Sequence, residues 1–373
     1  MDNLTHSLIG LAAAKAGLEK LSPGATALCL IAANLPDGDV ITLLGGRWFY
    51  LEQHRGITHS IVGTLALAVL LPIVFLLFDK LIAYLRKRPP KVKLRGLLIA
   101  SLLITATHPF MDWTNNYGVR PLLPWSSQWV YGDFVFIIDP FLWLTLGGAV
   151  FLVTSKSKKQ IVAWIIIALI PSYLVLFGNR GLGNTMVVRA IWFAALVILT
   201  VLFMRSAGQI WREKIPRVAL GVVAVYLVAL FTIHVIALRQ ARFEGQEIAR
   251  SNGENALDVA AMPTAANPFE WLCVVETSRA SYRFNVSLLS GSRSNPVRHE
   301  RADASNSRTV WTAIEDNSAR VFLGFARFPV VTVVGEDCIT QTLVQFADLR
   351  YTEPGSNRGT FSLEVPVACP QLD

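Results

Sequence analysis

The sequence predicts an all-α polytopic membrane bundle followed by a small β-rich extracytoplasmic domain. Of its 373 residues, 53% are hydrophobic and only 16% are charged, against roughly 25% charged residues in soluble domains. The apolar residues form long runs that are separated by short basic loops. Residues 239–373, in contrast, have the composition of an ordinary soluble chain. The excess of apolar residues therefore belongs to the first part of the chain alone.

Six apolar segments approach the ~20 residues that a membrane-spanning helix needs. They are Thr58–Phe78, Gly96–Trp113, Phe134–Thr154, Ile161–Phe177, Val187–Met204 and Val218–Leu238. Two shorter apolar runs, Leu4–Ala16 and Gly24–Leu35, precede them. Each would rise only ~20 Å as a helix, which is less than the thickness of the hydrocarbon core. These two runs predict a helical hairpin that packs inside the bundle.

The charges in the connecting loops predict the orientation in the membrane. Lysines and arginines crowd the connections at 80–95, 156–159 and 205–217, and such short basic loops stay in the cytoplasm. The loops around 36–57, 114–133 and 178–187, together with residues 239–373, then fall outside. We expect a multi-pass protein of the cytoplasmic (inner) membrane. Because the net charge of +8 is concentrated in these loops, the expected partners are membrane lipids and not nucleic acid.

Three regions are expected along the chain. Residues 1–240 form the membrane-embedded helical domain, 241–266 a linker, and 267–373 the β-rich extracytoplasmic domain. Segments rich in β-branched and aromatic residues predict its strands: Trp271–Val275, Tyr282–Leu289, Thr309–Ile314, Val321–Phe328, Val330–Val334, Gln341–Phe346 and Thr360–Val367. The polar stretch Ser290–Ser307 is expected to be a mobile loop. Three cysteines of this region permit one disulfide, and the pair stays open: Cys273, Cys338 and Cys369.

Ionisable residues gather in the first third of the sequence. The histidines there are His6, His54, His59 and His108. The carboxylates near them are Asp37, Asp39 and Asp112. The predicted orientation puts all of these residues at the outer ends of their helices. We therefore expect them to converge near the outer surface of the membrane.

Imidazole nitrogen and carboxylate oxygen together suit a divalent metal. Zinc is the leading candidate, with manganese or iron as alternatives, and the absence of CxxC spacing disfavours a thiolate site. His108 and Asp112 are four residues apart and so share one helical face. A metal at such a site activates water near neutral pH, and Arg55 could stabilise a developing oxyanion. Asp37 or Asp39 could serve as ligand or as general base, and the sequence leaves this choice open.

Simpler interpretations exist for each of these residues. A single membrane histidine often hydrogen-bonds a neighbouring helix, and aspartates in a Pro-Asp-Gly-Asp stretch often only form turns. His234, in an apolar span, and His299, in a polar loop, are expected to be structural or solvated. Ionisable residues at membrane depth are nevertheless costly and usually functional. The clustering of several such residues favours a metal site.

Several motifs resemble the YdjM-like family of membrane-bound, metal-dependent hydrolases. They are Thr5-His6, Pro36-Asp37-Gly38-Asp39, the string from His54 to Ser60, His108-x₃-Asp112, Asn115-x-Tyr117-Gly118 and Asp139-Pro140. The resemblance covers residues 1–240. It implies a helical core similar to those of zinc-dependent phospholipase C and P1 nuclease, which hydrolyse phosphoesters with clustered zinc ions. Carried over by position, the metal-ligand candidates are His6, Asp37, His54, His59, His108 and Asp112.

Two functional hypotheses follow. The first is a metal-dependent hydrolase that acts on a phosphoester, such as that of a lipid headgroup, at the outer face of the cytoplasmic membrane. The alternative is a non-enzymatic membrane protein that binds metal or lipid for transport or envelope stability. In that alternative the β-rich region is a periplasmic binding module, whose size a bare hydrolase would not need.

Overall fold

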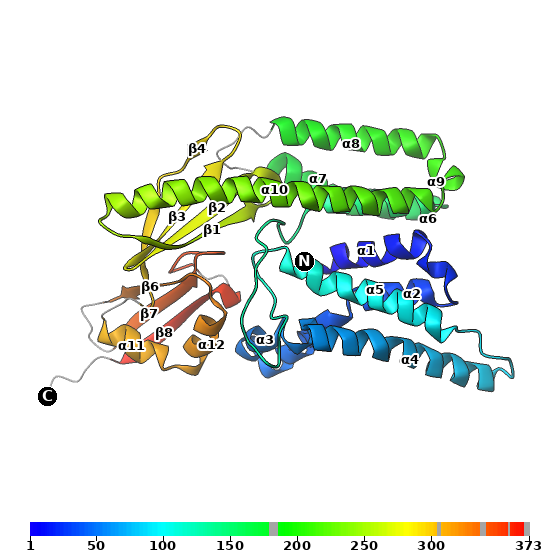
Figure 1. The fold of residues 1–373 in the computed structure, drawn as a ribbon, viewed down its shortest axis with the longest axis horizontal. Coiled ribbons are helices and arrows are strands. Elements are labelled where there is room, and N and C mark those ends of the chain that lie inside the picture. Colours follow the sequence, from blue (N-terminus) through cyan, green and yellow to red (C-terminus); the bar gives the residue numbers. More distant parts are fainter. Residues whose placement is uncertain (179–185, 304–306, 336–340, 357–358, 369–373) are drawn as a thin grey trace. The chain divides into compact units, whose positions relative to one another are not determined.

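The chain folds into two compact units, which Figure 1 traces from the N-terminus in blue to the C-terminus in red. The computed structural model describes residues 1–178, 186–303, 307–335, 341–356 and 359–368. The first unit, here called the helical unit, comprises Met1–Asp39, Arg55–Ile233 and Pro263–Pro268. The second, here called the C-terminal unit, comprises Val40–His54, His234–Met262 and Phe269–Asp373. The predicted order of a helical membrane region and a β-rich region is confirmed.

The helical unit begins with a short hairpin and continues with longer apolar helices. The hairpin consists of α1 (Asn3–Lys15), η1 (Leu18–Lys20) and α2 (Ala25–Ala32), and η2 (Leu35–Gly45) leads out of it. The following helices are α4 (Ile61–Leu85), α5 (Leu94–Trp113), α6 (Pro140–Thr154), α7 (Lys158–Tyr173) with η4 (Leu174–Gly178), α8 (Met186–Met204), α9 (Ala207–Ile210) and α10 (Lys214–Ser251).

Five helices of the described residues are long and apolar enough to cross a membrane: α4, α5, α7 with η4, α8 and α10. The pair α2 and η2 also passes this test together, although the two are bent by 47° against each other. Large apolar side chains cover the outside of these helices, as in Leu70, Phe78 and Val225. A surface of this kind fits a lipid environment and not water.

The expected span Phe134–Thr154 differs from the structure, because α6 begins only at Pro140. Asp139 caps this helix, since its carboxylate accepts the backbone N–H groups of Phe141 and Leu142. Pro140 occupies the first helical turn, where a missing N–H costs nothing. Phe134 and Val135 are buried in the core as part of a non-helical segment. The predicted span therefore began too early, because the apolar residues before Pro140 are buried without being helical.

The stretch 241–266, expected as a linker, also has a different structure. The helix α10 continues without interruption to Ser251, and the strand β1 (Ala256–Thr264) follows after four residues. The later part of α10 packs on the sheet, because a Cβ added at Gly245 would lie only 2.4 Å from Val275. Contacts with the sheet stabilise helical structure here, although the local sequence is polar.

The C-terminal unit contains one sheet in the order β1-β2-β3-β5-β6-β7-β8, with β4 paired to β3. Its further strands are β2 (Asn267–Thr277), β3 (Ala280–Ser287), β4 (Ser292–Arg293), β5 (Val297–Arg301), β6 (Pro329–Val334), β7 (Gln341–Asp348) and β8 (Ser362–Ala368). The pairings from β2 to β8 are antiparallel. Within Ser290–Ser307, expected as a mobile loop, the structure has β4 and β5, and residues 304–306 lie outside the described part.

Two expected strands of this unit, Thr309–Ile314 and Val321–Phe328, are mainly helical in the structure. They correspond to α11 (Arg308–Ile314) and α12 (Asn317–Phe325). Ala319, Phe322 and Phe325 are buried at intervals of three residues, which is a helical spacing. The short helix α3 (Arg47–Gln53) also belongs to this unit, because Trp48 packs edge-on against Phe322 with ring centroids 6.5 Å apart.

The cysteine predictions are tested only in part. Cys29 and Cys273 are buried free thiols. Cys338 and Cys369 lie outside the described residues, so the structure does not test their pairing.

The basic connections of the helical unit gather at one end. The turn between α1 and α2 is their meeting point: Ser22 Oγ accepts the backbone N–H of Lys93 at 2.9 Å, and Lys20 forms an ion pair with Glu213. The Arg217 guanidinium also donates to the carbonyl of Ala16 at 2.7 Å. Since the long helices alternate in direction, the start of α1, the start of α4 and the end of α5 lie at the opposite end.

Candidate metal centre

Four side chains converge at that opposite end of the helical unit. Asp37, His59, His108 and Asp112 each offer a ligand atom, and these atoms all lie within 4.8 Å of one another. His59 Nε2 lies 3.1 Å from His108 Nε2, and Asp37 Oδ1 lies 3.3 Å from both nitrogens. Asp112 Oδ2 lies 3.2 Å from His59 Nε2 and 3.5 Å from His108 Nε2. Two imidazoles and two carboxylates thus enclose one small space.

Three short stretches of chain position these side chains. Asp37 lies in η2, after the turn at Ala33 and Asn34 that follows α2. His59 ends the 3₁₀ turn η3 (Ile57–His59), and Ser60 then caps α4 by accepting the N–H of Gly63 at 3.1 Å. His108 and Asp112 are on the last turns of α5, four residues apart and on one face.

Contacts of the two Nδ1 atoms orient the imidazoles of His59 and His108 toward the space between the four side chains. His108 Nδ1 lies 2.6 Å from the carbonyl oxygen of Ala33, so Nδ1 donates and the lone pair of Nε2 faces the cluster. His59 Nδ1 lies 3.0 Å from Thr58 Oγ1 and 3.5 Å from Asp39 Oδ2. Burial alone would lower the pKa of His59, but its contacts with Asp112 and Asp37 outweigh burial and raise that pKa.

Arg55 packs behind the cluster in a left-handed backbone conformation, with a φ of 52°. Its side chain is buried, and one guanidinium nitrogen lies 3.1 Å from Asp112 Oδ1. The other donates to Asn115 Oδ1 at 3.1 Å and to the Gly118 carbonyl at 3.2 Å. Tyr117 lies under the guanidinium, 4.6 Å away. Arg55 thereby neutralises and orients Asp112.

Asp39 contacts the chain segment from Arg55 to His59, which carries one of the cluster histidines. Its Oδ2 accepts the backbone N–H of Arg55 at 2.9 Å and the hydroxyl of Thr58 at 3.3 Å. Asp39 is buried, whereas 14% of the Asp37 side chain is exposed. Asp37 is therefore the more accessible of the two carboxylates.

His6 lies against the cluster. Its ring stacks on His108 with centroids 3.8 Å apart, and His6 Nε2 lies 3.3 Å from Asp112 Oδ1. The amino group of Met1 contacts the same oxygen. Neither ring nitrogen of the buried His6 has a well-formed hydrogen bond with any described residue. Buried nitrogen atoms of this kind are suited to contact a bound ligand.

His54, the remaining predicted ligand, caps the end of α3 and stacks on Tyr50, with ring centroids 4.6 Å apart. His54 belongs to the C-terminal unit, and the four-residue cluster does not include it. The two histidines expected to be structural also lie elsewhere: His234 packs against Trp271, and His299 lies in β5.

Sequence reasoning assigned no role to Asn115 and Thr58, although both support the cluster. Asn115 Oδ1 accepts hydrogen bonds from Arg55 and from the backbone N–H of Tyr117. The signal in the sequence was their place in two motifs of the family resemblance, the string from His54 to Ser60 and Asn115-x-Tyr117-Gly118. Asp139, also near in the sequence, has a structural role, because it caps α6 and accepts the hydroxyl of Tyr226 at 3.0 Å.

The cluster lies in the part of the chain that matches a known family. Residues 1–182 match the model of the YdjM inner membrane protein family. The resemblance drawn from the motifs is confirmed over these residues. With the apolar helices, the YdjM match identifies this chain as a membrane protein.

Part of the chain is also similar to one bacterial protein. The chain is 30% identical over 160 residues to "Uncharacterized protein YfhP" of Bacillus subtilis (strain 168). The match covers 40% of this chain and 45% of that relative. No solved structure matches this chain.

Proposed function

We propose that this protein is a membrane-bound, metal-dependent hydrolase that acts on a phosphoester, such as that of a lipid headgroup. The observation that supports this proposal is the buried set of two imidazoles and two carboxylates within 4.8 Å. Such a mixed nitrogen and oxygen set suits zinc, with manganese or iron as alternatives. Buried charges are costly unless they are paired or bind a metal.

The donors present fit a divalent cation. Asp37, His59, His108 and Asp112 would hold it, and the imidazole of His6 lies beside them. The buried ring nitrogens of His6 have no well-formed hydrogen bond among the described residues, and the Nε2 atoms of His59 and His108 face each other at 3.1 Å. A bound divalent metal supplies Lewis acidity and activates water for hydrolysis near neutral pH.

The remaining residues take distinct roles in this proposal. Asp37, which is partly exposed, serves as ligand or as general base at the open side of the cluster. Asp39 and Arg55, which the sequence also offered for catalysis, are positioning residues in this proposal: Asp39 contacts His59, and Arg55 forms an ion pair with Asp112. The terminal nitrogens of the buried Arg55 contact Asp112, Asn115 and Gly118, which favours a positioning role over direct contact with a substrate oxyanion.

The charge distribution supports a location for the site. The connections rich in lysine and arginine stay in the cytoplasm by the positive-inside rule. The cluster lies at the other end of the helical unit, and therefore at the outer face of the cytoplasmic membrane. The span in α10 begins at the basic end, so the C-terminal unit that follows it is extracytoplasmic.

Turnover of a generic phosphodiester by the detergent-purified protein tests the proposal. We expect turnover that a chelator abolishes and added zinc restores, and a loss of at least a hundredfold in His59→Ala and His108→Ala. His299→Ala is the matched control, because His299 lies in β5, and it should retain full turnover. Metal binding without any chelator-sensitive turnover of several phosphoesters would favour the non-enzymatic alternative.

A further inference from the structure

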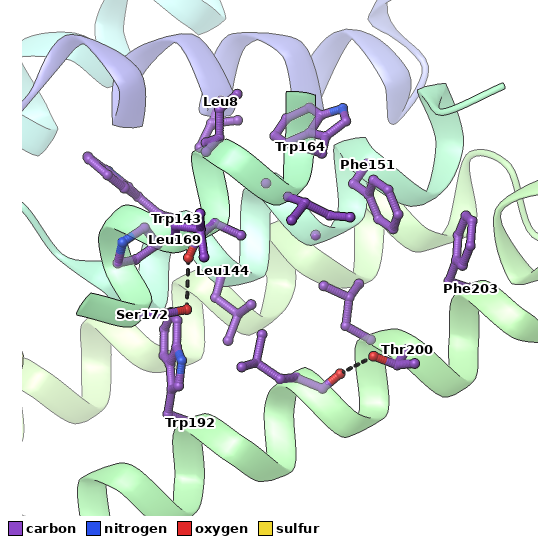
Figure 2. A pocket seen from close by; sticks show the side chains of 18 of the residues that line it. Leu8, Trp143, Leu144, Phe151, Trp164, Leu169, Ser172, Trp192, Thr200 and Phe203 are labelled. Carbon is purple, nitrogen blue, oxygen red and sulfur yellow. Dashed lines mark hydrogen bonds between the residues drawn. The ribbon is translucent and has the colours of Figure 1, made fainter. Parts of the chain in front are cut away.

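A second site lies in the helical unit, away from the metal cluster. The helices α7 and α8 both pack on α6 and leave a cavity of about 370 Å³ between them, with α1 as a further wall (Figure 2). Three tryptophans line it, Trp143, Trp164 and Trp192, together with aliphatic and phenyl side chains. Its volume lies within the ~300–1,000 Å³ typical of ligand pockets.

Most polar groups in the wall of this cavity form hydrogen bonds within the protein, and the indole N–H of Trp192 is the exception among the described lining residues. Figure 2 shows the hydroxyls of Ser172 and Thr200 turned back to their own helices, where they donate to the carbonyls of Ala168 and Leu196 at 2.8 Å. The indole N–H of Trp143 is also occupied, because it donates to Thr5 Oγ1 at 2.9 Å. A cavity with such walls attracts hydrocarbon and not water.

A basic pocket adjoins the apolar cavity, and the two share Ile161 and Phe203 as walls. This pocket lies at the basic end of the helical unit and is lined by four cationic and two acidic side chains: Lys15, Lys20, Lys156, Arg212, Glu19 and Glu213.

Part of this charge is already neutralised. Lys15 pairs with Glu19 at 2.7 Å, and Lys20 pairs with Glu213. Lys156 and Arg212 have no ion-pair partner among the described residues. Two positive charges therefore remain at the mouth of an apolar cavity.

We infer that the cavity and the basic pocket together bind an anionic glycerophospholipid. Its phosphate lies near Lys156 and Arg212, and one acyl chain occupies the apolar cavity. The inference rests on charge complementarity at one end and on apolar walls at the other, in helices that a bilayer surrounds. This lipid site does not depend on the proposed hydrolase activity, since it contains none of the four cluster residues.

Glycine at position 147 offers a direct way to block the acyl chain. A Cβ added at Gly147 would be in ordinary contact with Trp164 at 3.5 Å and Leu8 at 3.8 Å, and both residues line the cavity. A longer side chain must therefore extend into the cavity itself. Gly221, in α10, has no atom within 4 Å of an added Cβ and provides the matched control.

Native mass spectrometry of the full-length protein in detergent tests the inference. The probes are phosphatidylglycerol and phosphatidylcholine with identical acyl chains. We expect several-fold stronger retention of phosphatidylglycerol, and loss of this preference in Lys156→Gln/Arg212→Gln. The control Lys158→Gln/Lys159→Gln changes two exposed lysines of the same connection outside the pocket and should keep the preference. An unchanged preference in the first variant, or an equal loss in both, would overturn the inference.

The acyl chain is tested separately. Gly147→Leu should reduce retention of both lipids several-fold, whereas Gly221→Leu should not. If Gly147→Leu fails to fold, lipid binding by the wild-type protein still tests the acyl-chain site. Long single-chain phosphatidylglycerol should bind more tightly than a short-chain form, and glycerol phosphate should not compete. Binding that is independent of chain length, or full competition by glycerol phosphate, would show an anion site and contradict the lipid site.

Discussion

At the scale of single residues, Arg55 connects backbone conformation to the charge of the metal cluster. A non-glycine residue in the left-handed region costs of order 1–2 kcal/mol, so other contacts must stabilise it. Arg55 N–H donates to Asp39, and its guanidinium contacts Asp112, Asn115 and Gly118. The planar fork of arginine reaches these acceptors at once, which the single ammonium of lysine cannot do.

The substitution Arg55→Lys should therefore weaken metal binding while keeping the charge. We expect the dissociation constant for zinc to rise about 10–100-fold, the range typical of lost supporting contacts around a metal. Titration with a competing chelator measures this change. Arg120→Lys is the control, because Arg120 also lies 4.6 Å from an aromatic ring, that of Trp129. Equal zinc affinity in both variants would show that Arg55 does not support metal binding.

At the scale of helices, the close approach of α1 and α2 brings His6 to the cluster. A Cβ added at Gly10 of α1 would lie 2.5 Å from the carbonyl oxygen of Cys29 and 2.9 Å from Ala33 Cβ. The carbonyl of Ala33 in turn accepts from His108 Nδ1. A glycine at this position therefore permits both the helix contact and the orientation of one imidazole.

Gly10→Ala should push α1 away from α2. Overpacking of this kind costs about 1–3 kcal/mol, so we expect a lower Tm in detergent and a reduced zinc content. Gly221→Ala, also in a helix but with open space around it, should leave both unchanged or raise the Tm slightly. The interpretation of the α1–α2 contact fails if Gly10→Ala has the Tm of the wild-type protein.

Apolar periodicity and residue spacing correctly predicted those elements whose structure does not depend on contacts with distant parts of the chain. The hairpin of α1 and α2 and the shared face of His108 and Asp112 follow from apolar periodicity and helical spacing. The sequence did not reveal that α10 continues through residues 241–251, or that α11 and α12 are helices, because contacts with the sheet decide these structures. Spacing did not separate His59, which belongs to the four-residue cluster, from His54, which does not, because the fold of the chain between them is not set by local sequence.

At the scale of the whole molecule, the helical unit has two chemically different ends. Basic connections gather at one end, and buried histidines and aspartates at the other. The positive-inside rule converts this asymmetry into an orientation in the membrane. The proposed hydrolase site and the inferred lipid site would then face opposite leaflets.

Single cysteines test this orientation. In a background without the four native cysteines, Ser127→Cys should react with a membrane-impermeant maleimide in intact spheroplasts. Arg86→Cys should react only after permeabilisation, because Arg86 is an exposed residue of a basic connection. The reverse labelling pattern would place the metal cluster on the cytoplasmic side.

The metal content of purified protein tests the central claim most directly. After dialysis against metal-free buffer, elemental analysis should find a divalent metal, expected to be zinc, in stoichiometric amounts in the wild-type protein and in His299→Ala. His59→Ala and His108→Ala should lose most of it while keeping the Tm of the metal-free wild-type protein. Full metal content in both cluster variants would contradict the account.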